Sequence, residues 1–467
     1  MTDFNNARPP RPRSRGTAIR VCSVIATLAA VSACNTDKLL KVADVDVVSP
    51  AVLVGRSVLP SALAAAIGDF GVALGGSSTS EGQSQMVGLL TDELINAESF
   101  PTRIEVDQRN TNPINATMLV IFRDIARARA TADAVADRYK EFDPTNRSYA
   151  EVLALAAYTR VILAENYCSG VPISTSNADG SFTYGEPQTT AQILTLAIAK
   201  FDEAIAVATA AGAAGAPQLA LARIGKGRAQ LDLGQFAAAA VTVAAVPTSA
   251  RYVIFHDENS TRQNNGIFTF AQTGRRFAIP DREGINGMPF RSLNDPRAPA
   301  FRASATAIGF DASTPLIVTP KFPNRSASTP VAEGVEARLI EAEAALQVGN
   351  SALYLSKLNE ARAGAITYNT TLGGPVAASP PPIAAAPATQ AGQVDLLFQE
   401  RAIDLFLTSH RVGDLRRLIR QYGRDAETVF PTGSYFKGGS YGKDVNLPVP
   451  FEEQNNPQFK GCLNRNA

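Results

Sequence analysis

The sequence predicts a mostly α-helical fold, because helical periodicity is frequent and strand signals are few. Apolar residues recur at i, i+3, i+4 and i+7, the spacing of one helix face. The clearest case is Met118, Ile121, Phe122 and Ile125. Strand-like runs are short and lie at residues 252–255 and 267–270, which are candidates for one hairpin. Further helices are expected near residues 148–166, 189–211, 217–232, 235–246, 331–348, 351–365, 394–408 and 411–421.

Two of the expected helix pairs share a pattern at their junction. In each, Leu-x-x-Gly closes the first helix, at Leu231 to Gly234 and at Leu346 to Gly349, and small residues open the next helix. Small residues let two helices approach closely, which is typical of tetratricopeptide-like hairpins. The two glycines are 115 residues apart in the numbering, so a regular solenoid is not expected.

Two segments lack helical periodicity and are expected to be loops. Residues ~248–329 are rich in Asn, Arg, Gly and Pro and form a long loop-rich insertion. Residues 373–393 are a Pro/Ala/Gly stretch with too few large apolar side chains to pack, which indicates a surface loop. The sequence therefore predicts helical hairpins beside an irregular, loop-rich lobe.

The N-terminus is typical of an export signal. A basic stretch from Arg8 to Arg20 precedes an apolar run at residues 21–33, which is too short to span a bilayer. The run ends in Val31-Ser32-Ala33-Cys34, which resembles a bacterial lipobox, where the cysteine is acylated and becomes the new N-terminus. We therefore expect a signal peptide at 1–33, a lipid on Cys34 and a polar tether at 34–49. The alternative is an ordinary signal peptide with an incidental cysteine.

Charge argues against a nucleic-acid partner. Residues 1–33 hold five Arg and one Asp of the chain's 44 basic and 43 acidic residues. The remainder, with 39 basic and 42 acidic residues, has a net charge of −3 and no basic run.

Two cysteines remain after the signal segment, Cys168 and Cys462. In an oxidising compartment they are candidates for a disulfide that ties the C-terminal tail to the body. The alternative, which the sequence favours equally, is that both cysteines are free, buried thiols.

Several motifs in order along the chain resemble the SusD/RagB family of outer-membrane nutrient-binding lipoproteins. After Cys34, the segments that carry the resemblance are residues 121–128 and 165–173, Asn294-Asp295-Pro296-Arg297, and residues 337–344, 358–362, 400–405, 410–417, 448–450 and 455–457. The resemblance implies tetratricopeptide-like helices packed against an irregular lobe at residues 50–467. It also implies lipid anchoring at the cell surface and delivery of an oligosaccharide or similar oligomeric nutrient to a TonB-dependent, SusC-like transporter. No catalysis, cofactor or metal is implied. The chain departs from starch-binding members in having no Trp.

Glu400 falls within an apolar stripe of a predicted helix. The stripe consists of Leu396, Glu400, Ile403 and Leu407, at i, i+4, i+7 and i+11. A carboxylate there needs a partner, since burying it alone costs several kcal/mol. Arg411, Arg416 and Arg338 are candidates, and we expect Glu400, Arg411 and Asp414 to be structural, clamping the C-terminal segment to the helices. The alternative role, a catalytic acid, is disfavoured because a nearby Arg would lower the pKa of this carboxyl.

The chain has only two histidines, too few for a His-based triad or zinc site. His410 follows a predicted helix and is expected to be a surface or capping group. His256 lies in the loop-rich lobe, where contact with a ligand is an open alternative.

Two stretches combine aromatic rings with planar polar groups, as a ligand site requires. One holds Asp92, Phe100, Arg103 and Asn110, just before the helix near residue 118, and in the family this region contributes to the ligand pocket. The other holds Arg276 and Phe277. For any one of these residues the competing interpretation is a solvated or inward-packed loop residue. Two other classes of protein stay open: a helical envelope scaffold without a ligand, and a secreted hydrolase with paired carboxylates.

Overall fold

The computed structural model of the protein describes residues 55–177 and 181–464. The predicted signal peptide, Cys34 and the tether lie outside these residues. Helices dominate the described part of the chain, which confirms the mostly α-helical prediction.

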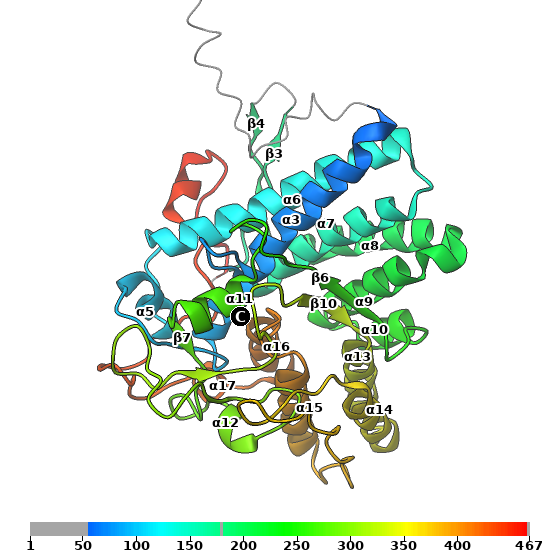
Figure 1. The fold of residues 1–467 in the computed structure, drawn as a ribbon. Helices are drawn as coiled ribbons and strands as arrows, with labels where there is room; N and C mark the ends of the chain where they lie inside the picture. The colour runs from blue at the N-terminus through cyan, green and yellow to red at the C-terminus, as the bar shows by residue number, and fades with distance from the viewer. Residues whose placement is uncertain (1–54, 178–180, 465–467) are drawn as a thin grey trace, which may run out of the picture. The chain divides into compact units, whose positions relative to one another are not determined.

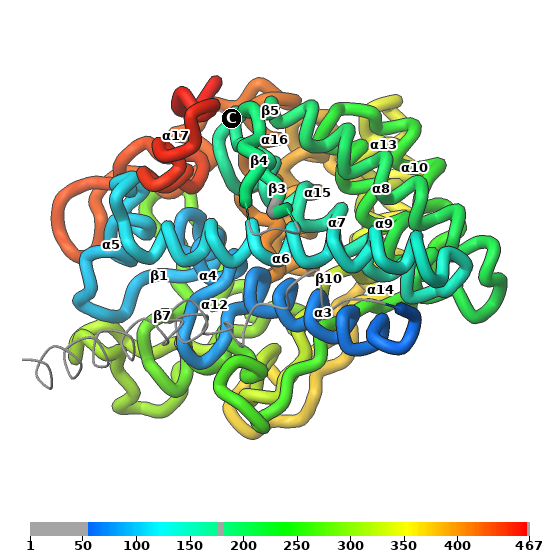
Figure 2. The backbone as a smooth tube through the Cα atoms, turned by 90° about the horizontal axis from the view of Figure 1, so that it is seen from above, coloured from blue at the N-terminus to red at the C-terminus, as the bar shows by residue number. Residues whose placement is uncertain are grey.

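A stack of helical hairpins forms the larger part of the fold. It consists of α3 (Leu59–Gly75), α6 (Ala116–Phe142), α7 (Arg147–Asn166), α8 (Thr190–Ala210), α9 (Ala216–Asp232), α10 (Phe236–Val243), α13 (Gly334–Gln347) and α14 (Ser351–Gly364). Each helix packs against the next one in this order, so the hairpins share one continuous core (Figures 1 and 2).

Side chains at the helix starts fix these boundaries. The Asn115 carboxamide oxygen accepts from the backbone N–H groups of Thr117 and Met118, which would otherwise lack a partner in the first turn of α6. A reciprocal pair, Thr189 and Gln192, caps α8 in the same way.

Small residues within α9 bring neighbouring helices together, whereas the glycines of the two Leu-x-x-Gly motifs, Gly234 and Gly349, have positive φ angles and no neighbour within 4 Å. A Cβ added at Gly225 of α9 would lie 2.3 Å from the ring of Phe201 on α8. One added at Gly227 would lie 2.5 Å from Val243 of α10. Both positions therefore need glycine for packing rather than for a special backbone conformation.

The C-terminal part returns along the stack. It comprises α15 (Gln390–Asp404), α16 (Arg411–Tyr422), α17 (Ala426–Val429) and a short 3₁₀ turn, η5 (Phe451–Asn455). The predicted Pro/Ala loop is irregular up to Thr389. The Thr389 hydroxyl caps α15, so this helix begins at Gln390, four residues before the predicted start at residue 394.

Within the described residues the strands are short and pair antiparallel, and two of the pairs lie in the connection between α7 and α8. The pairs are β1 (Ile95–Asn96) with β7 (Phe277–Ala278), β2 (Val171–Pro172) with β5 (Pro187–Gln188), β3 (Thr175–Ser176) with β4 (Phe182–Thr183), β6 (Arg251–Ile254) with β10 (Thr329–Glu333), and β8 (Phe301–Arg302) with β9 (Ile317–Val318). The remaining short helices and helical turns are η2 (Arg56–Val58), α4 (Gln83–Leu90), α5 (Pro101–Asp107), η3 (Gly212–Gly215), α11 (Gly266–Phe268), the π-turn η4 (Thr269–Thr273) and α12 (Phe290–Leu293).

The predicted hairpin of residues 252–255 and 267–270 is wrong. The first run is β6, but it pairs with β10, far along the chain. The second run is helical, in α11 and η4, because Asn265 caps it by accepting from the N–H of Phe268. A short apolar run has no periodicity that separates a strand from a buried helical turn.

Helix α3 was not predicted from the sequence. Residues Arg56–Gly75 form a helical stretch that is long and apolar enough, by length and composition, to cross a membrane. Half of it is buried against α6 and the loop-rich lobe, which is the environment of a core helix.

Candidate functional site

Two exposed phenylalanine rings from distant loops lie together on the loop-rich lobe. Phe100 is 43% exposed and Phe310 is 48% exposed. Their ring centroids are 6.1 Å apart and their planes differ by 25°. Large apolar rings at the surface bury little area in the free protein, so a pair of them is a candidate contact surface for a ligand.

The guanidinium group of Arg276 lies against both rings. Its central carbon is 5.1 Å from the Phe100 centroid and 5.4 Å from the Phe310 centroid. Arg103, on α5, is 5.8 Å from Phe100 on another side. Beneath them, Phe270 of η4 is 5.8 Å from Arg276. The site therefore combines flat apolar faces with N–H donors.

Buried carboxylates balance these cations. Glu98 is fully buried; it accepts from Arg276 at 2.6 Å and lies 3.3 Å from Arg103. Burial raises the pKa of Glu98, and the two arginines oppose this rise. Arg103 also pairs with Glu81. The guanidinium groups are thus fixed in place and nearly neutralised before any ligand arrives.

Backbone hydrogen bonds join the segments that carry the rings. The Ala97 N–H donates to the carbonyl of Arg276 at 2.8 Å, extending the β1–β7 pair. The Phe310 N–H donates to the carbonyl of Arg275 at 2.8 Å. Gly309 packs so tightly that an added Cβ would lie 2.5 Å from the carbonyl oxygen of Ala97. The two rings are therefore held by rigid backbone pairing rather than by flexible loops.

A Gly-rich segment near the C-terminus adds a third exposed ring. Phe436 is 47% exposed and is followed by Lys437. The Lys437 ammonium donates to the carbonyl of Glu98 at 2.6 Å and lies 2.8 Å from Asp311. This places Phe436 beside the segments that hold Phe100 and Phe310. We call the surface of Phe100, Phe310, Arg103, Arg276, Phe436 and Lys437 the aromatic site.

Only some of the predicted ligand residues come together there. Phe100, Arg103 and Arg276 do. Phe277 is fully buried below them, 6.1 Å from Phe270 between centroids. Asp92 is also buried, with both oxygens 2.7 Å from Arg411, so it does not face a ligand. Asn110 is exposed, but it lies beyond the C-terminal end of α5, whereas Phe100 lies at its start.

Phe310, Phe436 and Lys437 were missed because nothing local marks them. Phe436 lies in Gly433-Ser-Tyr-Phe-Lys-Gly-Gly, where aromatic residues among glycines were the one available signal. Phe310 lies in an irregular loop, and only the folded backbone brings it to Phe100.

The sequence matches no protein-family model and no curated protein. Solved structures, however, follow the same chain path. A SusD superfamily protein from Bacteroides fragilis gives a TM-score of 0.61 at 13% identity, covering 87% of this chain and 99% of that chain. A SusD-like carbohydrate-binding protein from the same organism gives 0.58 at 15% identity, covering 86% and 99%. A laminarin-binding SusD-like protein gives 0.60 at 14% identity, covering 88% and 99%. This chain has the SusD-like fold.

Within this SusD-like fold, Glu400 binds two arginines that were not among its expected partners. Arg297 Nη1 is 2.7 Å from one carboxylate oxygen and Arg362 Nη1 is 2.6 Å from the other. The expected partners, Arg411, Arg416 and Arg338, are wrong. Arg411 binds Asp92. Arg416 donates to the backbone carbonyls of residues 164, 165 and 167. Arg338 donates to the backbone carbonyls of residues 243 and 246. Glu400 faces the loop that carries Arg297, not α16.

Asp414, the other acidic residue expected to be structural, lies on α16 and is buried. It accepts from Arg401 at 2.9 Å and from Arg417 at 3.0 Å. The Arg401–Asp414 contact thus joins α15 to α16, and the Arg411–Asp92 pair joins α16 to the segment after α4.

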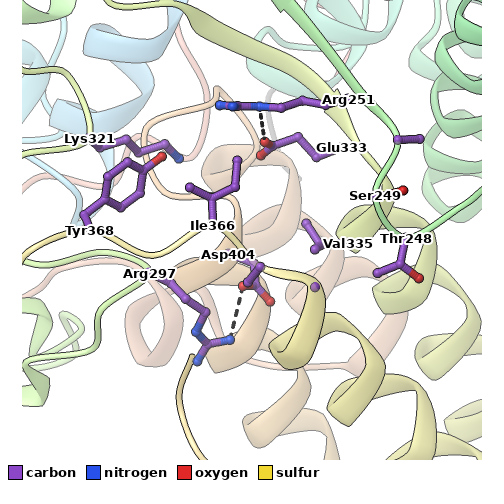
Figure 3. A pocket seen from close by; sticks show the side chains of 13 residues that line it. Thr248, Ser249, Arg251, Arg297, Lys321, Glu333, Val335, Ile366, Tyr368 and Asp404 are labelled. Carbon is purple, nitrogen blue, oxygen red and sulfur yellow. Dashed lines mark hydrogen bonds and ion pairs between the residues drawn. The ribbon is translucent and has the colours of Figure 1, made fainter. Parts of the chain in front are cut away.

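A hollow between the helical stack and the loop-rich lobe lies beside Arg297 and Asp404 (Figure 3). Its walls carry two ion pairs, Arg251–Glu333 at 2.9 Å and Arg297–Asp404 at 3.2 Å. Lys321 also lines it, and its ammonium donates to the carbonyl of Phe406 at 2.7 Å. Since these charges are satisfied by the protein, we assign them to holding the two parts of the fold together.

His410 is not a surface group, and although it occupies the N-cap position of α16 its side chain makes no capping hydrogen bond. It is buried, with Nε2 2.7 Å from Arg228 and 3.1 Å from Glu336. Burial and Arg228 lower the pKa of His410, and Glu336 opposes this shift. His256 is partly buried and bonds to Thr329 at 2.9 Å.

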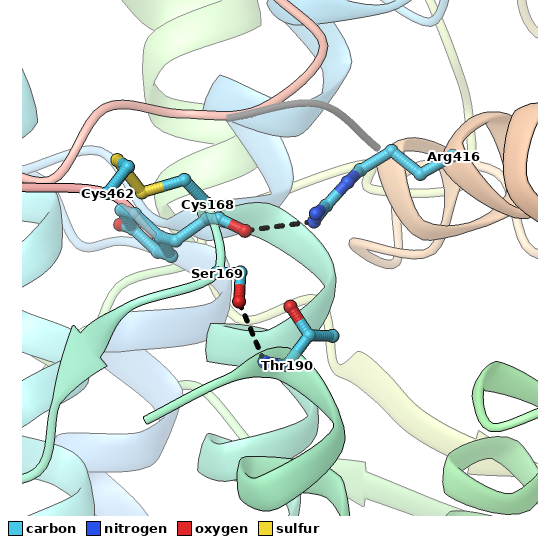
Figure 4. Close-up of a disulfide and its surroundings, with 6 residues drawn as sticks. Cys168, Ser169, Thr190, Arg416 and Cys462 are labelled. Atoms are coloured by element: carbon cyan, nitrogen blue, oxygen red, sulfur yellow. Dashed lines mark hydrogen bonds between the residues drawn. A yellow bond between two sulfur atoms is a disulfide. The ribbon is translucent and has the colours of Figure 1, made fainter. Parts of the chain in front are cut away.

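Cys168 and Cys462 are joined by a disulfide, with their Cα atoms 5.8 Å apart (Figure 4). Next to it, the Leu463 N–H donates to the carbonyl of Ser169 at 2.7 Å, and Arg416 donates to the carbonyl of Tyr167 at 2.9 Å. The disulfide thus fixes the end of the chain beside the C-terminus of α7.

Proposed function

We propose that this protein binds a neutral oligosaccharide at the aromatic site and passes it on for import. The observation that carries the proposal is the exposed Phe100–Phe310 pair with Arg276 held against both rings. Sugar rings present flat C–H faces that pack on aromatic rings, and their hydroxyls accept from guanidinium N–H groups.

The charge balance supports an uncharged ligand. Arg103 and Arg276 are matched by Glu81 and Glu98, and Lys437 is matched by Asp311. A polyanion would find little unpaired positive charge here, since these cations already have partners. Two of the structurally similar proteins are described as carbohydrate-binding or laminarin-binding.

Calorimetry with soluble glycans tests the proposal. The panel contains laminarin, starch fragments, mannan and an acidic polygalacturonate. We expect a neutral glycan to bind, and Phe100→Ala or Phe310→Ala to weaken it about tenfold, or ~1.4 kcal/mol. Phe182→Ala is the matched control, because Phe182 is 62% exposed on the distant β3–β4 hairpin (Figure 1). Equal affinity in all three variants would rule out the aromatic site.

We further propose binding without catalysis. The carboxylates around the rings are held by cations, whereas a glycosidase needs one protonated and one free carboxyl facing its substrate. Prolonged incubation should therefore leave the bound glycan at its original length, as measured by chromatography. Shortened products that disappear in Glu98→Gln would indicate a hydrolase.

The cellular role that we propose is that of a surface lipoprotein of the outer membrane. The lipobox-like Val31-Ser32-Ala33-Cys34 and the SusD-like fold support a lipid anchor on Cys34 and a TonB-dependent, SusC-like transporter as partner. Cys34→Ser should abolish palmitate labelling and partition with outer-membrane vesicles. Membrane association and labelling that persist in this variant would refute the anchor. Purification of the anchored protein should bring a TonB-dependent barrel with it.

A further inference from the structure

A second hollow lies where α8 begins, beside the end of α9 and one side of α16. Its volume is about 260 Å³, and it has no residue in common with the aromatic site or with the hollow beside Arg297. A single water molecule needs about 10–15 Å³. The second hollow can therefore take in a small ion together with a group attached to it.

Arg416, which lines this hollow, is a buried cation without a carboxylate partner among the described residues. Its side chain is 1% exposed. Nη1 donates to three backbone carbonyls at the end of α7, including that of Tyr167 at 2.9 Å, and these carry the partial negative charge of a helix C-terminus. Nε is buried with no partner, and Nη2 has none within the described part of the chain. Since an unpaired buried charge is strongly unfavourable, these unused donors favour an anion as their partner.

Arg420 lies one turn further along α16 and lines the same hollow. It is exposed, and no acidic side chain of the described residues forms an ion pair with it. Burial and the neighbouring Arg420 lower the pKa of Arg416, because the two positive charges repel each other. An anion between the two guanidinium groups would relieve this repulsion.

The first turn of α8 adds backbone donors from another direction. This helix has 21 residues, so the N–H groups of its first turn lie at the positive end of a long helix dipole. The N–H of Thr190 donates to the Ser169 hydroxyl at 3.3 Å. The N–H of Ala191 lines the hollow and has no hydrogen-bond partner in the described ranges. Figure 4 shows the Arg416 side chain pointing toward the segments that carry Ser169 and Thr190.

Asp232, at the end of α9, is the one acidic residue in the described lining of this hollow. It is buried, and its nearest cation is Arg417, 3.6 Å away and outside the lining. Burial and the nearby Glu165 raise the pKa of Asp232 well above its ordinary value. This carboxyl therefore opposes an anion less than an exposed aspartate would, and two cations and a helix N-terminus outweigh it.

We propose that this second hollow binds a phosphate group, held by Arg416 and Arg420 from α16 and by the first turn of α8. Guanidinium groups and helix N-termini are the donors that phosphate oxygens accept most readily. The two oxygens of a carboxylate lie in one plane, whereas the tetrahedral oxygens of phosphate can meet donors from both helices. A soluble phosphate monoester and a phospholipid headgroup present the same group.

Calorimetry of the full protein with inorganic phosphate tests the proposal, in sodium chloride at constant ionic strength. We expect saturable binding in the millimolar range or tighter. Arg420→Gln should weaken it about tenfold or more, because it removes one charge-assisted contact. Arg424→Gln is the matched control, since Arg424 is paired with Asp395 at 2.7 Å outside the hollow, and it should bind phosphate normally. Arg416→Gln should abolish binding, and Arg420→Gln decides the test if that variant does not fold.

A new charge at Ala191 separates binding from stability. Ala191 is exposed, and a carboxylate in the first turn of a helix is favourable to the helix. Ala191→Glu should therefore abolish phosphate binding while the melting temperature stays the same or rises. Ala191→Gln, of the same size and uncharged, should still bind.

Two further probes distinguish the sources of the phosphate group. Tighter binding of glucose 6-phosphate than of inorganic phosphate would assign a soluble monoester. Sedimentation with phosphatidylcholine vesicles that contain phosphatidic acid, lost in Arg420→Gln, would assign a lipid headgroup.

The absence of a binding signal with millimolar inorganic phosphate would overturn the inference. Equal affinity for phosphate in the unaltered protein, Arg420→Gln and Ala191→Glu would also overturn it. Neither result bears on the proposed function, because no glycan is present and the aromatic site is unchanged in these variants.

Discussion

Replacing Arg297 with methionine removes the cation at the junction between the loop-rich lobe and α15. The Arg297 side chain is 1% exposed and lies 2.8 Å from Asp295, 2.7 Å from Glu400 and 3.2 Å from Asp404. Glu400 keeps its second partner, Arg362, but Asp404 has no other cation within salt-bridge distance among the described residues. Leaving a buried charge uncompensated costs about 3–5 kcal/mol. We expect Arg297→Met to lower the free energy of unfolding by that amount at pH 8.

The pH dependence of this loss of stability tests whether the uncompensated charge of Asp404 causes it. Burial raises the pKa of Asp404 to about 6, although Arg297 opposes the rise. Because the folded-state pKa lies above the unfolded value, the stability associated with Asp404 falls as the pH rises through about 6. Without Arg297 this carboxyl takes up a proton more readily. The destabilisation by Arg297→Met should therefore be smaller at pH 5 than at pH 8.

Urea unfolding followed by circular dichroism measures both values. Arg424→Met is the matched control, since Arg424 forms an exposed pair with Asp395 at 2.7 Å and should contribute under about 1 kcal/mol. A loss below about 1 kcal/mol for Arg297→Met at pH 8, or an equal loss at both pH values, would refute this reasoning.

Three further changes, the first with a matched control, test the packing, the covalent link and a helix cap. Gly225→Ala should destabilise by about 1–3 kcal/mol in thermal unfolding, because its methyl group would collide with the rings on α7 and α8. Gly68→Ala, on α3 with nothing within 4 Å, should be neutral or stabilising, and equal effects of the two would contradict the packing argument. The double variant Cys168→Ser, Cys462→Ser should lose about 2–5 kcal/mol in the free energy of unfolding, because the bridge closes a loop across 294 residues. Its melting temperature should no longer depend on reductant. Asn115→Ala removes the cap of α6 and should lower the free energy of unfolding by about 1 kcal/mol, measured by urea unfolding. An unchanged free energy of unfolding would mean that the cap is not needed.

Helices with one apolar face were predictable from sequence, because local spacing alone defines that face. The α7 boundaries agree within one residue of the expected 148–166, and those of α9 do so for 217–232. In contrast, α3 escaped notice because its Ala/Gly-rich sequence is apolar on most sides and has no clear stripe.

Contacts between side chains far apart in the sequence were not predictable. The apolar stripe correctly indicated that Glu400 is buried, but its partner Arg297 is 103 residues away in a loop without periodicity. For the same reason the sequence pointed to Phe100, Arg103 and Arg276 without showing that Phe310 and Phe436 join them. Short loop segments acquire their positions from tertiary hydrogen bonds, which no local pattern encodes.

The hydrogen bond that the Tyr435 hydroxyl donates to Asp107 joins residues 328 positions apart. During synthesis, α5 and Phe100 leave the ribosome long before the segment that forms the third side of the aromatic site. A nascent or truncated chain that ends before residue 430 could assemble the helical hairpins but would have an open, two-sided site. The third side of the aromatic site thus forms only when the segment around Tyr435 packs back onto the end of α5.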